Sequence, residues 1–185
     1  LPRFASHAIC AAVAGLVVVA VDTTNVNAQN VDIQNPNVVA GQATWSAGQN
    51  QWTINAGHKA IIQYNAFNIH NGGSVQFIQP GMNAAVLNRI IGNDPSMING
   101  HMSANGKVFF VNPAGVTFGP NAVVNVGQLF AAAGHMSNSD FLNGINRFQD
   151  MNGTITNLGS IRANGVALLG QHVVNRGTII APGGF

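Results

Sequence analysis

Residues 106–133, GKVFFVNPAGVTFGPNAVVNVGQLFAAA, decide the fold of this chain. The stretch begins as an apolar strand, turns at Asn-Pro-Ala-Gly, continues as a short strand, turns again at Gly-Pro-Asn and ends in a third apolar segment. Short buried strands separated by tight polar corners are typical of a β-solenoid. Residues 108–111 are apolar at every position, which predicts a strand covered on both faces.

A repeat near the end of the sequence supports the same interpretation. The frame N-x-G-[ST]-I-x-A-x-G begins at Asn157 and again, eighteen positions later, at Asn175. One coil of a parallel β-helix has about this length, near the roughly 20-residue lower end of solenoid repeats. Because the repeat is still running at Phe185, we expect this chain to be the front part of a longer exoprotein.

The sequence before these coils also predicts short strands. Residues 43–46 and 51–54 flank a Gly-Gln-Asn turn and predict a hairpin, and strand-like segments follow at residues 59–69, 74–79 and 84–91. Residues 139–148 are the exception. Ser139 or Asp140 can cap a short helix there, with Phe141, Ile145 and Phe148 at helical spacing. We expect this helix to cover one end of the core.

The composition limits the function. Apolar residues make up 46% of the 185 residues, so the chain has room for one ordinary domain with a core, but only 6% are charged and the net charge is +2. The Lys and Arg residues are scattered singly, which argues against nucleic-acid binding. The single Cys10 excludes a disulfide framework within the chain, and the scattered histidines predict no metal site, so we expect no cofactor and no metal.

The N-terminal segment, residues 1–28, predicts a secretory signal peptide. Arg3 precedes the apolar run ICAAVAGLVVVAV at residues 9–21, and Val26 and Ala28 stand at positions −3 and −1 of a cleavage site. The run is shorter than the roughly 20 residues of a membrane-spanning helix. We therefore predict a signal peptide at residues 1–28, cleavage between Ala28 and Gln29, and one β-helix domain at residues 29–185.

Several ordered motifs resemble the two-partner secretion (TpsA) domain at the N-terminus of filamentous-haemagglutinin-type exoproteins. The matching stretches are IQYNAFNI at residues 62–69, LNRIIG at 87–92, DPSMING at 94–100 and VNPAGVTFG at 111–119. The resemblance covers residues 38–185. The motif residues that it singles out for transporter recognition or for a motif turn are Asn88, Arg89, Asn99, Gly100, Asn112, Pro113, Ala114, Gly115, Phe118 and Gly119.

Two positions depart from the family pattern. The family's NPNG turn reads Asn-Pro-Ala-Gly here, with Ala114 in place of an Asn whose side chain can close a turn. A second family motif, NPNL, has a similar stretch at residues 35–38, Asn-Pro-Asn-Val, which comes before the first strands that the pattern predicts.

The resemblance implies an all-β fold, a right-handed parallel β-helix with an N-terminal cap and a small extra-helical sheet. It also implies a secretion signal of a large adhesin or haemagglutinin-like exoprotein, not an enzyme. The implied partner is an outer-membrane TpsB-type transporter with POTRA domains, and the protein would cross the periplasm of a Gram-negative-type bacterium to be secreted or held at the cell surface. Contact with a host or neighbouring cell would then belong to a downstream region.

Two alternatives remain open at this stage. The first is a β-helix enzyme acting on polysaccharides. A glycosidase needs a pair of carboxylates, and only Asp32, Asp94, Asp140 and Asp150 lie outside the predicted signal peptide. The second is a purely structural, self-associating solenoid, which differs from the secretion domain in lacking a transporter partner.

Overall fold

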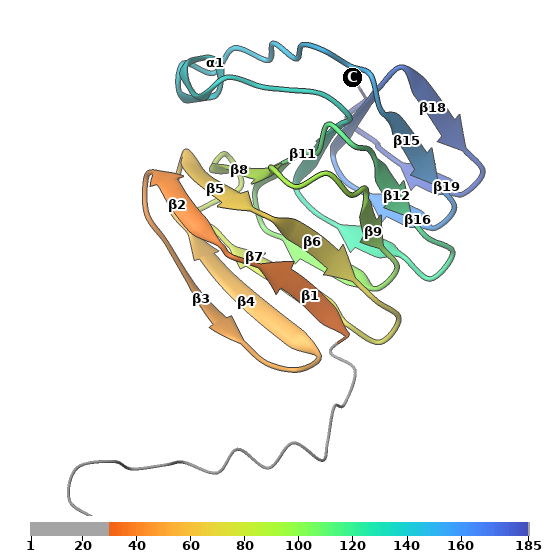
Figure 1. Cartoon of the computed structure of the whole chain (residues 1–185), viewed down its shortest axis with the longest axis horizontal. Helices are drawn as coiled ribbons and strands as arrows, with labels where there is room; N and C mark the ends of the chain where they lie inside the picture. The colour runs from red at the N-terminus through yellow and green to blue at the C-terminus, as the bar shows by residue number, and fades with distance from the viewer. Residues whose placement is uncertain (1–29, 185) are drawn as a thin grey trace, which may run out of the picture.

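The computed structural model describes residues 30–184, and the predicted signal peptide lies outside this range. Within it the chain forms nineteen strands and one short helix, and all the strands belong to three sheets (Figure 1). Sheet 1 contains β1 (Val31–Gln34), β6 (Ala66–Ile69), β9 (Ser96–Ile98), β12 (Val116–Phe118), β15 (Thr154–Asn157) and β18 (His172–Asn175). Sheet 2 contains β2 (Asn37–Ala40), β5 (Ala60–Tyr64), β8 (Ala85–Ile90), β11 (Lys107–Val111), β14 (Gln128–Ala132) and β17 (Gly165–Leu169). Sheet 3 contains β3 (Ala43–Ala47), β4 (Gln51–Ala56), β7 (Ser74–Ile78), β10 (His101–Ala104), β13 (Val123–Asn125), β16 (Ser160–Arg162) and β19 (Thr178–Ile180).

From β4 onward consecutive strands enter different sheets, so each coil adds one strand to every sheet. From β4 onward the neighbours within each sheet run parallel, which confirms the predicted parallel β-helix. The C-terminal repeat sets the register of the last coils. Asn157 lies opposite Asn175 and Ser160 lies opposite Thr178, so one 18-residue repeat makes one coil.

An antiparallel first coil caps the N-terminal end, as expected. β1, β2 and β3 pair antiparallel with β6, β5 and β4, and the β3–β4 pair is the predicted hairpin. The prediction that residues 35–38 precede the first strands is wrong. β1 buries Val31 and Ile33 ahead of them, and Asn35 makes the turn into β2 with a φ of +48°.

The core has an interior layer and an outer layer, and β11 contributes to both. Val108 and Phe110 point into the coil, where the Phe110 ring lies edge-on to Phe67 at 5.1 Å. Phe109 and Val111 point outward into a second apolar cluster on sheet 2. The prediction of a strand covered on both faces is therefore confirmed, since residues 133–153 leave the coil and cover this outer face.

The helix in that excursion, α1 (Asn138–Leu142), corrects three expectations. Its N-cap is Ser137 rather than Ser139 or Asp140, because the Ser137 hydroxyl accepts from the Asp140 backbone N–H at 3.0 Å. It covers the outer face of sheet 2 and not an end of the core, since Phe141 packs on Phe109. It also stops at Leu142, and the exposed Ile145 follows it.

The extra-helical element also differs from the small sheet that the resemblance implies. Outside the three sheets, the described residues show a single antiparallel bridge, between His135 and Gln149, on the two sides of the α1 excursion. Residues 30–184 contain no helix with the length and apolar character needed to cross a membrane.

Candidate functional site: the motif corner

Eight of the ten predicted site residues lie at two corners of the coil, and the other two lie in strand β8. Asn112, Pro113, Ala114 and Gly115 make the turn from β11 to β12, and Asn88 and Arg89 lie near the end of β8 in the preceding coil. We call residues 94–96 together with residues 112–115 the motif corner. The remaining residues, Asn99, Gly100, Phe118 and Gly119, line the neighbouring corner between sheets 1 and 3.

Asn112 closes its own turn. Its side-chain oxygen accepts from the backbone N–H of Ala114 at 3.0 Å, and its backbone carbonyl accepts from Gly115 at 2.9 Å. This is an Asx turn, in which an Asn side chain takes the place of a backbone carbonyl. The turn is therefore complete with alanine at position 114, because position 114 contributes only its backbone.

The same Asn112 side chain joins two coils. Its amide donates to the Asp94 carbonyl and to the Ser96 hydroxyl, both at 3.0 Å, and the Ser96 backbone N–H donates to the Gly115 carbonyl at 3.0 Å. Asn112 is fully buried and Ser96 nearly so. A buried amide whose nitrogen and oxygen are both paired fixes the register of the two turns, since any shift leaves polar groups unpaired.

Asn88 and Arg89 are neighbours in β8 with opposite environments. Asn88 points into the core, where it accepts from the Tyr64 hydroxyl at 3.0 Å and donates to the Phe109 carbonyl at 3.3 Å. Burial raises the pKa of Tyr64 well above its usual value. Arg89 points outward and donates to Asn138 Oδ1 at 2.7 Å and to the Met136 carbonyl at 2.6 Å. Asn88 therefore supports the core, and Arg89 ties the α1 excursion to sheet 2.

The second corner depends on close backbone approach. A Cβ at Gly100 would lie 2.4 Å from the Gly73 carbonyl oxygen, and one at Gly119 would lie 2.3 Å from Asn99 Oδ1. That Asn99 oxygen accepts from the Asn121 backbone N–H at 3.0 Å. Glycine is required at position 100 because two coils touch there through their backbones, and at position 119 because the Asn99 side chain fills the space of a Cβ.

Comparison with known proteins shows the family of this chain. The family model described as the TPS secretion domain matches residues 18–183. The chain belongs to the TPS secretion-domain family. The heme/hemopexin-binding protein of Haemophilus influenzae is 33% identical over 160 residues, which cover 80% of this chain and 18% of that protein. A second Haemophilus influenzae protein with the same name is 42% identical over 73 residues, 40% of this chain and 8% of its own length.

A solved structure agrees with both the family and the fold. The HMW1 secretion domain from Haemophilus influenzae superposes with a TM-score of 0.78 at 34% identity, over 80% of this chain and 42% of that one. This TPS chain therefore spans less than half of each of these relatives. The identities of 33% and 34% over most of the chain, together with the shared β-helix, place the motif corner in a known type of secretion domain.

The folded TPS domain hides most of its motif residues. Asn88, Gly100, Asn112, Gly115, Phe118 and Gly119 are buried, whereas Arg89, Asn99, Pro113 and Ala114 are partly exposed. Sequence reasoning did not single out Ser96, Met136 or Asn138 as partners. The serine lies inside a quoted motif, but Met136 and Asn138 lie 47 and 49 residues from Arg89 and carry no local signal.

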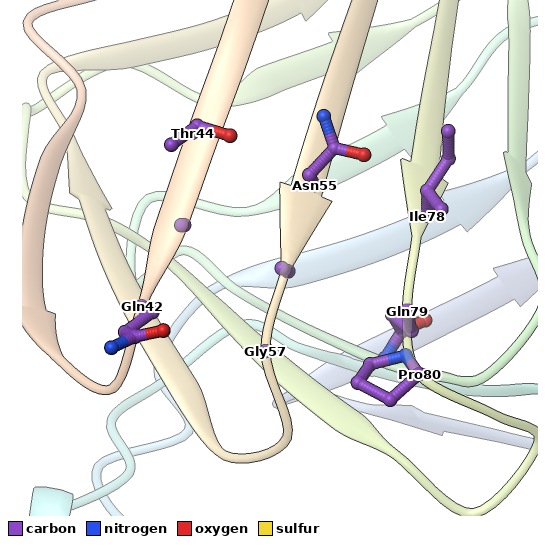
Figure 2. A pocket seen from close by; sticks show the side chains of 9 residues that line it. Gln42, Thr44, Asn55, Gly57, Ile78, Gln79 and Pro80 are labelled. Atoms are coloured by element: carbon purple, nitrogen blue, oxygen red, sulfur yellow. The ribbon is translucent and has the colours of Figure 1, made fainter.

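A groove of about 370 Å³ lies on the outer face of sheet 3, at the capped end of the TPS domain (Figure 2). Figure 2 shows Thr44, Asn55 and Ile78 on three neighbouring strands, β3, β4 and β7. No ionisable side chain lines this groove, so it lacks the acids and bases of a hydrolytic site. Within residues 30–184, no three His, Cys, Asp or Glu side chains are grouped to hold a metal ion.

Proposed function

We propose that this TPS domain is the segment through which an outer-membrane TpsB-type transporter with POTRA domains recognises an exported exoprotein. The observation that carries the proposal is the family match across residues 18–183 on a chain whose family motifs lie at two neighbouring corners of the coil and in β8. The partly exposed Pro113, Ala114, Asn99 and Arg89 are the motif side chains that a folded domain offers to a partner. The buried motif residues act by shaping that surface.

We also propose that the domain starts the folding of a longer β-helix. Its N-terminal strands, β1–β3, pair antiparallel with the strands that they cover, whereas the last strands, β17, β18 and β19, continue the parallel pairing of the coils. Unpaired strand edges are templates on which further strands form. In this proposal the antiparallel strands β1–β3 mark the start of the parallel stack, and further parallel coils form on the edges of β17, β18 and β19.

The exported protein that we propose is adhesin or haemagglutinin-like, secreted or held at the surface of a Gram-negative-type bacterium. The relatives support secretion and a binding role, since one is named a heme/hemopexin-binding protein and another the secretion domain of HMW1. Contact with host or neighbouring cells belongs, in this proposal, to regions outside the TPS domain, because the aligned part is only 18% of the first relative.

We assign no catalytic role to the domain. Two of its aspartates hold structure. Asp32 accepts from Gln34 and Asn68, and Asp140 accepts from Ser137 and lies 3.8 Å from Arg147. These carboxylates lie on different parts of the fold, in β1 and in α1, rather than facing one another across a cleft as glycosidase carboxylates do.

Secretion in a reconstituted pair of proteins tests the transporter proposal. The chain is expressed with and without a TpsB-type transporter from the same genome, and the protein in the medium is measured. We expect export only with the transporter, and loss of export when the POTRA domains are deleted. Equal export without the transporter would contradict the proposal and favour a self-associating solenoid.

A further inference from the structure

A second cavity, of about 250 Å³, lies between the outer face of sheet 2 and the α1 excursion. Its apolar wall is made of aromatic rings. Phe109 and Phe130 stack with their centroids 4.3 Å apart and their planes 6° apart, and Phe141 of α1 lies edge-on to Phe109 at 5.2 Å. Because Phe109 and Phe130 cover each other's faces and are no more than 6% exposed, they offer the cavity mainly ring edges, and a ring edge favours the face of a planar apolar group.

The polar wall of the cavity is positively charged. Both lysines of the whole chain, Lys59 and Lys107, line it together with His58, although the chain carries only seven Lys and Arg residues. No aspartate lines the cavity, and the one salt bridge among the described residues joins Arg147 to Asp140. Neither lysine therefore has a carboxylate partner within residues 30–184. Uncharged amide side chains complete the polar wall: Asn83, Gln128 and Asn146.

Lys59 is held in an unfavourable conformation at the edge of the cavity. Its φ is +61°, in the left-handed region that a residue with a side chain seldom adopts. Its backbone N–H donates to the Ala85 carbonyl at 2.8 Å, and its ammonium donates to the Leu142 carbonyl at 2.5 Å. An ammonium has three N–H donors, so two remain for a ligand. Strained residues of this kind concentrate at binding sites.

We propose that this cavity binds a small aromatic carboxylate with a single ring. The ring occupies the Phe109 and Phe130 side, and the carboxylate accepts charge-assisted hydrogen bonds from Lys107 and Lys59. The volume is slightly below the roughly 300–1,000 Å³ of sites for larger ligands, which restricts the occupant to about one ring. This site is separate from the motif corner and does not depend on the secretion proposal.

A titration followed by NMR amide shifts tests the site on the purified, exported chain. Benzoate is the probe, benzyl alcohol is its neutral analogue, and acetate is the anion without a ring. We expect saturable shifts from benzoate at Lys59, Lys107, Phe109 and Gly144, and much weaker binding of the other two probes. Equal shifts from acetate or from benzyl alcohol, or shifts scattered over the domain, would overturn the proposal.

Variants separate the lysine charge from the fold. Lys107→Met keeps the aliphatic part of the side chain. It should lower the affinity for benzoate about tenfold, since one charge-assisted hydrogen bond is lost. Lys107→Arg should retain most of the binding. Arg162→Met removes the same charge from an exposed position on sheet 3 and should leave the benzoate affinity unchanged. If Lys107→Met and Arg162→Met have the same affinity while both remain folded, the site is refuted.

Discussion

The side-chain amide of Asn112 donates to the hydroxyl of Ser96, 3.0 Å away and 16 residues earlier in the chain. Both side chains are buried, and the bond joins the Asp-Pro-Ser turn of one coil to the Asn-Pro-Ala-Gly turn of the next. Two stretches that look like separate family motifs in the sequence are one hydrogen-bonded unit in the fold. In the folded domain this unit joins two coils. The export of a variant in this unit should therefore be measured together with its stability.

Replacing Asn112 by alanine should destabilise the domain by about 3 kcal/mol, because it leaves the Ser96 hydroxyl, the Asp94 carbonyl and the Ala114 N–H without their partner. Denaturant unfolding measures this change. Gln76→Ala is the matched control, since Gln76 is an exposed amide on β7, and it should change stability by less than about 0.5 kcal/mol.

Export of the Asn112→Ala variant then distinguishes two roles for the turn. Lost yield with unchanged stability favours direct contact with the transporter. If both the export yield and the stability fall, the turn acts by stabilising the β-helix. Normal yield would refute the requirement for Asn112 in export.

Gly115→Ala should destabilise the domain by about 2 kcal/mol or more. Gly115 has a φ of +115°, and a Cβ there would lie 2.8 Å from the Thr154 carbonyl oxygen in the next coil. The comparison is Gly81→Ala, where φ is ordinary and no atom lies within 4 Å of the new Cβ. Thermal unfolding of the two variants side by side should show a lower Tm for Gly115→Ala only; similar Tm values would contradict the assignment.

The coil architecture is readable from sequence because its signals are local and repeated. The N-x-G frame at Asn157 and Asn175 encodes both the coil length and a backbone corner, and the structure places the two Asn side chains 2.8 Å apart. The short β1 was missed, since only Val31 and Ile33 mark it and it adjoins the predicted signal segment. Its partner strand β6 is distant in the sequence, with Val31 opposite Ile69, so no local pattern reveals the pairing.

The α1 excursion shows a second limit of sequence reasoning. Its N-terminus does have a sequence signal, the S-x-x-D pattern from Ser137 to Asp140, which marks the observed cap more closely than the Phe spacing does. The attachment of the segment to Arg89 has no such signal. It depends on two residues that only the folded coil brings to the end of β8.

Cleavage of the exported protein should follow Ala28. The small residues at positions −3 and −1, Val26 and Ala28, follow the apolar run at residues 9–21, as signal peptidase sites require. N-terminal sequencing of exported material should therefore begin at Gln29. Ala28→Leu should slow processing, and a mature protein that retains residues 9–21 would contradict the prediction.

Alkaline pH should destabilise the domain through Tyr64, the only tyrosine of the chain. Burial raises its pKa in the folded state, whereas the unfolded chain ionises near pH 10. The unfolded state therefore loses a proton that the folded state keeps, and stability falls above pH 10 by about 1.4 kcal/mol per pH unit. Below pH 10 the phenol is protonated in both states, so the stability that Tyr64 contributes is fully present.

Absorbance of phenolate and denaturant unfolding check this prediction together. The native protein should show no phenolate absorbance until it unfolds. In Tyr64→Phe the additional loss of stability with pH above pH 10 should disappear. The variant should be less stable at every pH, because Asn88 loses its hydrogen bond with the tyrosine hydroxyl. Reversible ionisation of Tyr64 in the folded domain near pH 10 would show that the ring is not buried as described.

Arg89→Met should release the α1 excursion while the coil stays folded. Arg89 donates two hydrogen bonds to this segment, and its planar fork suits two separate acceptors. Amide hydrogen exchange at His135, Phe141 and Gln149 should accelerate about tenfold or more. Exchange in Arg89→Lys should be faster than in the unaltered domain and slower than in Arg89→Met, because a lysine can replace one of the bonds more easily than both. Amides of β10 and β13, which lie in sheet 3, serve as the internal control. If their exchange accelerates to the same extent, the excursion is part of the global folding unit and not a separately attached segment.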